Sequence, residues 1–342
     1  MANNTHIERL SFFIKPGAQI SLMLFTLVLL FSSTYIYMRH PTNNDPMPGV
    51  KTFESRPDYS ATNIVKTGFF VRNFLEFDVN KNNFVADSYI WFEFDPKSVP
   101  LEAVADFYFG KADIKQKSPA YTATIDKKMI VGYNLQVGFQ TNLIYRKFPL
   151  DNHCISLTLN NAALPKYHAI LLADGETFQV ADSIYASGWS YQDKHVTSGL
   201  QINTLEPKTQ HALVTPRVVF GMDFANESFK RLLLILLPLF IISFLSLFTL
   251  SLDPFKDAGT IVTISATMMA ALVSYNFVIE AASPKVSYFT FGDTLFNTFL
   301  VLNFIIFIID TVWIKKLAPY RGIVVILFHL TLIAWWFMML YR

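Results

Sequence analysis

Five apolar stretches, each long enough to cross a lipid bilayer, set the strongest limit on what this chain can fold into. One lies near the N-terminus and four lie in the last third of the sequence. About 20 helical residues cross the hydrocarbon core of a membrane, because each residue advances a helix by roughly 1.5 Å. Each stretch therefore predicts a transmembrane helix. The predicted spans are 18–38, 232–250, 258–280, 295–313 and 323–340.

The span from 258 to 280 differs from the others, because hydroxyl and amide side chains recur along it. At helical spacing, one stripe is small and polar and ends in an aromatic ring. Such a stripe is typical of a helix-packing surface, where small residues let two helices approach closely. It also fits the wall of a water-filled pore, where hydroxyl groups replace part of an ion's hydration shell. This polar stripe comprises Gly259, Thr263, Thr267, Ala270, Ser274 and Phe277.

The composition excludes several classes of protein. With 52% hydrophobic and 16% charged residues, the chain is too apolar for an ordinary soluble protein. Its formal net charge of +2 argues against nucleic acid as a partner. The single cysteine, Cys154, excludes an internal disulfide framework, and the seven histidines show no metal-ligand spacing. Nucleophile elbows and phosphate-binding glycine loops are also missing, so we expect neither an enzyme nor a bound cofactor.

The N-terminal region admits two interpretations. Residues 1–17 form a polar cap with basic residues, and the apolar run 18–38 follows. A cleaved signal peptide has this arrangement, with the cleavage site near Ser32–Ser33. The apolar run continues past those serines without a small-residue cleavage pattern, which favours an uncleaved signal anchor. Residues 39–62 are rich in proline and predict an extended linker.

Residues 63–228 have the pattern of an all-β domain. Short runs rich in β-branched and aromatic residues alternate with turn signals, and we expect a β-sandwich. The first hairpin is predicted from Ile64 to Phe94, with its turn at Asp78–Asn83. Residues 229–342 then form a domain of four transmembrane helices. Further strands are predicted at Lys128–Tyr145, Cys154–Leu159, Gly199–Thr204 and Pro216–Phe224.

Charges in the short loops predict the orientation of the spans. Basic residues gather in the N-terminal cap, in 252–257 and in 314–322, and such loops stay in the cytoplasm. The β domain would then lie on the outer side of the membrane. Pro238 falls inside the span 232–250, where we expect a neighbouring helix to satisfy the carbonyl that the proline frees.

These features together resemble the pentameric ligand-gated ion channels, which carry an extracellular β-sandwich followed by four spans. The segment Phe148–Asp151 (FPLD) matches the aromatic-Pro-x-Asp loop at the base of their sandwich. Leu237–Leu239 resembles the proline region of their first channel helix, and Ser283–Tyr288 resembles the linker after their pore helix. The resemblance covers residues 63–342. An unpaired Cys154 and a short loop before the last span make the chain similar to a prokaryotic member.

The resemblance implies a homopentameric channel of the bacterial inner membrane, with its β domain on the periplasmic side and an unknown extracellular ligand. The polar stripe would line the pore. Small ions are expected to permeate, most readily monovalent cations, because Asp257 and Glu280 stand near the two mouths. Glu280 also fits a solvated helix end that pairs with Lys285. The residues expected to couple the two domains are Phe148, Pro149, Asp151, Pro284, Lys285 and Tyr288.

The chain departs from the family pattern in several places, one of which is Gly259, where cation-selective members carry a glutamate at the cytoplasmic mouth of the pore. The segments Asn160–Ala163 and Lys208–Val214 lack the aromatic side chains of the family's ligand pocket, and a cation–π cage needs such rings. Ala270 stands where a bulky aliphatic gate is usual, so we expect any hydrophobic constriction at Phe277. By alignment, Asn226 replaces an arginine before the first channel helix. Because of these departures, the alternative function is that of a non-conducting envelope sensor or scaffold with the same fold.

Overall fold

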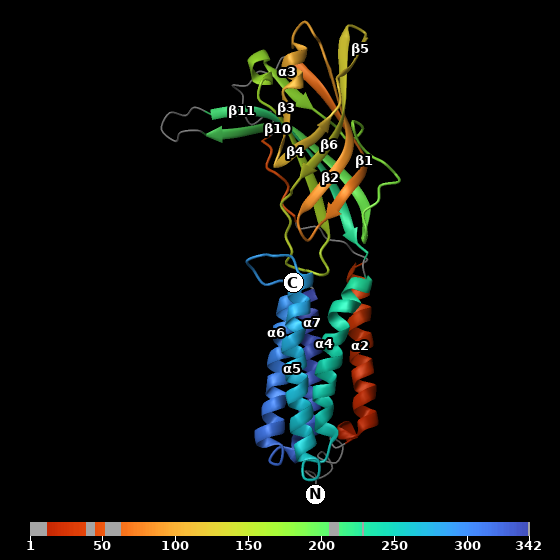
Figure 1. The fold of residues 1–342 in the computed structure, drawn as a ribbon, viewed down its shortest axis with the longest axis vertical. Helices are drawn as coiled ribbons and strands as arrows, with labels where there is room; N and C mark the ends of the chain where they lie inside the picture. Colours follow the sequence, from red (N-terminus) through yellow and green to blue (C-terminus); the bar gives the residue numbers. More distant parts are fainter. Residues whose placement is uncertain (1–11, 39–44, 52–62, 205–211, 228, 341–342) are drawn as a thin grey trace. The chain divides into compact units, whose positions relative to one another are not determined.

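The chain forms two compact units, one made of helices and one made of β-sheets (Figure 1). The predicted combination of a β-rich region with long apolar helices is therefore confirmed. The loop that contains the FPLD motif belongs to the helical unit, although it lies in sequence between two strands. In the computed structural model, the described residues are 12–38, 145–151 and 229–340 of the helical unit, and 45–51, 63–144, 152–204 and 212–227 of the β unit.

Within its described residues, the helical unit has five helices that are long and apolar enough to cross a membrane, which indicates a membrane protein. Each of them overlaps one of the predicted spans. Short 3₁₀ segments accompany them at η1 (Phe12–Ile14), η4 (Thr249–Ser251) and η6 (Ala318–Tyr320). The long helices are α2 (Pro16–Met38), α4 (Phe229–Phe248), α5 (Ala258–Ala282), α6 (Phe291–Ile308), which continues into the π-helical turn η5 (Ile309–Trp313), and α7 (Arg321–Leu340).

Helix α4 passes through Pro238 without ending, and α5 compensates for the proline. The proline has no N–H, so the carbonyl of Leu234, four residues earlier, loses its usual helical donor. The hydroxyl of Tyr275 on α5 donates to this carbonyl at 2.8 Å and lies 3.3 Å from the carbonyl of Ile235. The prediction that a neighbouring helix satisfies the freed carbonyl is confirmed.

The N-terminal helix α2 packs against α4 and α7, whereas α5 packs against α4 and α6. The ring of Phe31 contacts that of Phe240 on α4, with centroids 5.8 Å apart. The hydroxyl of Thr26 lies 2.9 Å from Nδ1 of His329 on α7, and both side chains are buried. Helix α2 is therefore an integral part of the helical unit, held by apolar contacts and by a buried polar one.

The β unit contains two sheets (Figure 1). The seven-stranded sheet has the order β4-β6-β2-β1-β8, with β5 also paired to β6 and β9 to β1; the four-stranded sheet has the order β10-β11-β7-β3. The strands are β1 (Asn63–Asp78), β2 (Asn83–Phe94), β3 (Phe107–Gly110), β4 (Ala112–Lys117), β5 (Tyr121–Ile125), β6 (Lys128–Phe139), β7 (His153–Asn161), β8 (Ala169–Leu172), β9 (Phe178–Val180), β10 (Trp189–Thr204) and β11 (Ala212–Asn226), with the short helices α3 (Leu101–Ala105) and η3 (Leu164–Tyr167).

Phenylalanine rings from the two sheets meet and form the core of the β unit. Phe69 of β1 contacts Phe220 of β11, with ring centroids 5.0 Å apart. Phe74 of β1 and Phe224 of β11 repeat this contact at 5.8 Å. Large aromatic side chains supply much of the buried apolar area that stabilises such a core.

The first hairpin forms as predicted, with Asp78 paired to Asn83 at its turn. Other strand boundaries differ from the prediction. Strand β10 begins at Trp189, ten residues before the predicted Gly199, because its polar first half pairs with β11 along the whole length. The predicted strand ending at Tyr145 stops at Phe139, where β6 gives way to an irregular segment.

Candidate functional site

The polar stripe lies on the exposed face of α5. All six of its residues are exposed in the chain, and Phe277 at its end has 71% of its surface accessible. The opposite face is buried against the rest of the helical unit through Ile261, Leu272 and Ile279. One face of this helix therefore belongs to the core of the unit, and the face that carries the polar stripe does not.

The threonines of the polar stripe bond to their own helix. The hydroxyl of Thr263 donates to the carbonyl of Gly259 at 2.9 Å, and that of Thr267 donates to the carbonyl of Thr263 at 2.8 Å. This bond uses the only proton of each hydroxyl and leaves the oxygen lone pairs directed outward. The stripe therefore presents a ladder of oxygen acceptors, the type of group that substitutes for water around a cation.

The two predicted selectivity residues lie at opposite ends of α5. Asp257 occupies the N-cap position, and its carboxylate accepts the N–H of Asp253 at 3.2 Å. Glu280 is exposed in the last turn. The 23 residue steps between them correspond to about 35 Å of helix, which is slightly more than the thickness of the hydrocarbon core. Both carboxylates would therefore stand near the two surfaces of a membrane that α5 crosses.

The loop Tyr145–Asp151, which holds the FPLD motif, is bound to the first turn of α6. The N–H groups of Phe291 and Gly292 donate to the carbonyls of Arg146 and Phe148 at 2.8 and 2.9 Å. The first four N–H groups of a helix have no acceptor within the helix. Here the loop supplies acceptors for two of them.

The other two N–H groups at the start of α6 are satisfied by a capping box. The side chain of Thr290 accepts the N–H of Asp293 at 3.2 Å, and the carboxylate of Asp293 accepts the N–H of Thr290 at 2.9 Å. This cap starts α6 at Phe291, four residues before the predicted span begins. Together, the cap and the loop Tyr145–Asp151 satisfy all four N–H groups at this helix end.

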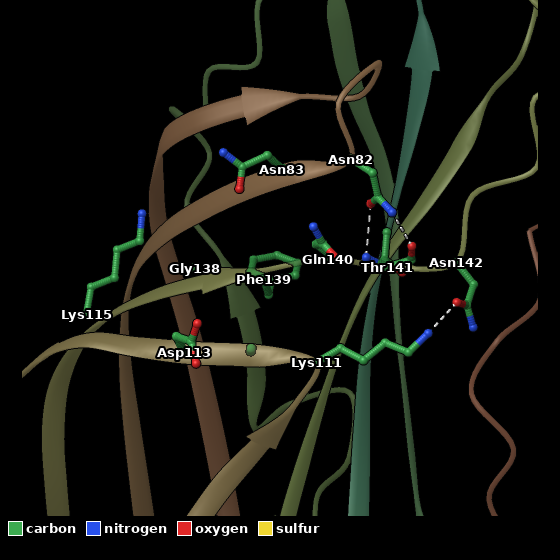
Figure 2. Close-up of a pocket in the computed structure, with 11 residues that line it drawn as sticks. Asn82, Asn83, Lys111, Asp113, Lys115, Gly138, Phe139, Gln140, Thr141 and Asn142 are labelled. Carbon is green, nitrogen blue, oxygen red and sulfur yellow. Dashed lines mark hydrogen bonds between the residues drawn. The ribbon is translucent and has the colours of Figure 1, made fainter. Parts of the chain in front are cut away.

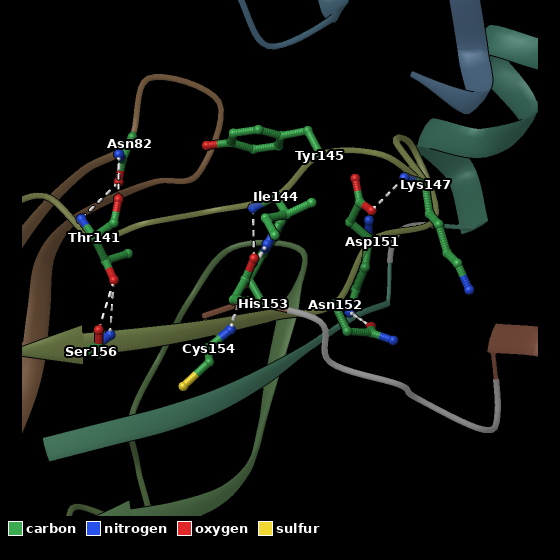
Figure 3. Close-up of polar contacts among 12 residues, drawn as sticks. Asn82, Thr141, Ile144, Tyr145, Lys147, Asp151, Asn152, His153, Cys154 and Ser156 are labelled. Atoms are coloured by element: carbon green, nitrogen blue, oxygen red, sulfur yellow. Dashed lines mark hydrogen bonds and ion pairs between the residues drawn. The ribbon is translucent and has the colours of Figure 1, made fainter. Parts of the chain in front are cut away.

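Asp151 closes the loop Tyr145–Asp151 from within. Its side chain is 8% exposed, and its Oδ1 accepts the N–H of Lys147 at 2.8 Å (Figure 3). The hydroxyl of Tyr288, one of the residues predicted to meet this loop, accepts the N–H of Tyr145 at 2.9 Å. Pro284 is buried and Lys285 is exposed. Backbone groups of the loop thus form hydrogen bonds with Tyr288 and with the start of α6.

Three basic residues of the helical unit, Lys230, Arg231 and Lys285, are candidate ion-pair partners for Asp151. Lys230 and Lys285 are both exposed. The side chain of Arg231 lies outside the described residues. The coupling role of these cations therefore stays a prediction.

A further contact to this loop comes from α2 and was not expected from the sequence. Nζ of Lys147 donates to the hydroxyl of Tyr37 at 2.5 Å and lies 5.0 Å from the centre of its ring. Such a contact adds a cation–π attraction to the hydrogen bond. The only sequence signal for it is a tyrosine near the end of an apolar helix, which is also typical of a side chain at the membrane surface.

A polar cavity of about 770 Å³ lies in the β unit at the ends of β2, β4 and β6 (Figure 2). Asn82 and Thr141 form two hydrogen bonds at its edge, and Lys111 donates to Asn142 at 2.7 Å. Among the described residues that line it, Phe139 is the one aromatic, and it is almost fully buried. The cavity therefore lacks the rings that a cage for an ammonium ligand needs.

No protein-family model matches this chain, and no curated protein matches it.

Proposed function

We propose that this chain is one subunit of a homopentameric ion channel of the bacterial inner membrane, in which α5 of each copy lines the pore. The observation that carries the proposal is the exposed polar stripe on α5. A helix that crosses a membrane normally exposes apolar side chains to lipid, whereas the polar stripe exposes three hydroxyl side chains, one glycine and one alanine before it ends at Phe277. Its opposite face is already used for packing within the chain.

The resemblance to pentameric ligand-gated ion channels, drawn from the FPLD motif and the order of the domains, supports the same function. Phe148, Pro149 and Asp151 lie in a loop that is bonded to Tyr288 and to the start of α6. A displacement of this loop would move the helix that packs beside α5. Packed elements that switch between two arrangements are a common basis of gating.

Cation preference is proposed because both ends of α5 carry a carboxylate. A ring of such groups concentrates cations at a mouth and repels anions. The exposed side chain of Glu280 would form the outer ring, and Asp257 the inner one. Gating by an extracellular ligand belongs to the same proposal.

Cysteine accessibility tests the pore assignment. In a Cys154→Ser background, single cysteines at Thr263, Thr267 or Ser274 should react with a charged, membrane-impermeant thiol reagent. Cysteines at the buried positions Ile261 and Leu272 are matched controls on the same helix and should react at least tenfold more slowly. Equal rates on both faces would contradict the proposal.

Single-channel recording from purified protein in planar bilayers separates the channel from the alternative of a non-conducting sensor or scaffold. A channel should pass discrete currents that reverse near the cation equilibrium potential in a salt gradient. Charged modification at Thr267 should block them, and modification at Leu272 should not. A protein that assembles but never conducts would support the scaffold.

A further inference from the structure

Three soft donor atoms meet on one face of the four-stranded sheet. Sγ of Cys154 lies 3.3 Å from Nε2 of His195 and 3.6 Å from Sδ of Met47. Nε2 of His195 lies 3.2 Å from the same Sδ. These three atoms form a closed triangle, which we call the donor triangle. The site lies entirely within the β unit.

The register of three strands brings Cys154 and His195 together. Cys154 of β7 pairs with Asp223 of β11, and Gly221 of β11 pairs with His195 of β10. Residues two apart on a strand share a face, so all four lie on the same side of the sheet. A side chain at position 221 would overlap the imidazole ring, and the glycine leaves His195 room to reach across β11 toward Cys154.

The third donor comes from a segment fixed at both ends. The carboxylate of Asp45 is 2% exposed and accepts the N–H groups of Ile144 and Cys154 at 2.6 and 2.9 Å. Lys51 forms two backbone hydrogen bonds with Leu200 of β10, at 3.0 and 2.9 Å. Met47 lies between these two anchors, so its thioether is held over the sheet.

The imidazole of His195 is oriented for ligation. Its Nδ1 lies 3.6 Å from a carboxylate oxygen of Asp223, which favours the proton on Nδ1. The lone pair of Nε2 then points toward the two sulfur atoms. Many histidine ligands of metal ions are held by a carboxylate in this way.

The spacing of the donor triangle suits a single metal ion. Ions bound to nitrogen and sulfur at about 2.0–2.3 Å hold neighbouring ligand atoms about 3.3–4.0 Å apart in trigonal or tetrahedral geometry. The three separations of 3.2, 3.3 and 3.6 Å need little adjustment to reach that range. A thiolate with a thioether is a soft donor pair, which selects monovalent copper over harder divalent ions.

We propose that Met47, Cys154 and His195 bind one monovalent copper ion. Cys154 is 4% exposed, and the negative charge of its thiolate balances the single positive charge of a cuprous ion. Binding replaces the S–H bond by an S–Cu bond and releases one proton to the solvent, without a change of oxidation state. The sequence gives no indication of this site, because its ligands come from three segments far apart in the chain. This inference is independent of the proposed channel function.

The test is an anaerobic titration of the purified full-length chain with Cu⁺ supplied as its bicinchoninate complex. We expect one Cu⁺ per chain, and X-ray absorption should show two sulfur neighbours and one nitrogen. Cys154→Ser should abolish binding at this site. Met47→Leu, which conserves volume, should weaken it at least tenfold, and Asp223→Asn by about 10–100-fold.

Two controls keep the same residue types away from the site. Met129→Leu on β6 and His168→Asn should bind Cu⁺ as the unaltered chain does. Circular dichroism establishes that each variant is folded, and Met47→Leu decides the question if Cys154→Ser does not fold. The proposal is overturned if Met47→Leu and Cys154→Ser bind Cu⁺ as tightly as the unaltered chain, or if a tenfold excess of Zn²⁺ displaces the copper.

Discussion

The hydrogen bond from Tyr275 to the carbonyl of Leu234 should stabilise the helical unit only because Pro238 is present. Tyr275→Phe removes the hydroxyl and leaves that carbonyl without its donor from α5. Hydrogen bonds between membrane helices contribute about 0.6–1.7 kcal/mol. We therefore expect Tyr275→Phe to lower the free energy of unfolding by about 1 kcal/mol, which is roughly a fivefold change in the folding equilibrium.

A double-mutant cycle with Pro238→Ala tests the cause of this loss. Alanine restores an N–H at position 238, which can donate to the carbonyl of Leu234 inside α4. In the Pro238→Ala background, Tyr275→Phe should then cost much less. The difference between the two costs, about 1 kcal/mol, is the coupling energy.

The assay is reversible unfolding of the full chain in mixed micelles by titration with a denaturing detergent, followed by circular dichroism. Tyr320→Phe, which removes a hydroxyl from an exposed tyrosine, is the control and should leave the midpoint unchanged. If Tyr275→Phe costs the same with proline and with alanine at position 238, the proposed compensation is wrong.

Two further outcomes are expected. Mass spectrometry of the mature protein should find α2 intact, because the buried contact of Thr26 with His329 joins this helix to α7; a chain that begins near Ser33 would identify a cleaved signal peptide instead. The pKa of Asp174 is lowered from 3.8, chiefly because its carboxylate accepts the N–H of Thr177, so the stabilisation is present above pH 3.8 and is lost as the pH falls below it. Asp174→Asn, which does not titrate, should therefore be less stable than the unaltered chain at pH 6. The difference between the two unfolding temperatures should shrink as the pH falls toward 3. If that difference does not depend on pH, this carboxylate is not its source.

The apolar spans and the first hairpin could be predicted because their signals are local. A run of about 20 apolar residues has few alternatives to a membrane helix, and Asp78–Asn83 interrupts two strand-like runs with turn residues. The exposure of the polar stripe was also foreseeable from helical spacing, because Ile261 and Leu272 fall on the other face. Whether that stripe lines a pore depends on contacts with other copies, which a single chain does not contain.

Other features were not predictable, because they depend on pairing between distant segments. Strand β10 begins with polar residues that show little strand character until β11 pairs with them. The donor triangle arises from the register of β7, β11 and β10 and from the anchoring of residues 45–51. No sequence motif with a regular spacing therefore predicts it. Likewise, a capping box at Thr290 started α6 inside a stretch that hydrophobicity alone assigns to a loop.

The attachment of the loop Tyr145–Asp151 to α6 has a consequence for mutagenesis. Both bonds to the helix run from backbone N–H groups to backbone carbonyls, so no side-chain truncation removes them. An alanine scan of the loop would leave both of these backbone hydrogen bonds in place. Such a scan would therefore underestimate the importance of the contact between the loop and α6. The contact is weakened instead by replacing the peptide N–H of Gly292 with an ester oxygen. This replacement deletes one hydrogen-bond donor and leaves every side chain in place. As long as both backbone hydrogen bonds are present, the loop and α6 should move together as one rigid body.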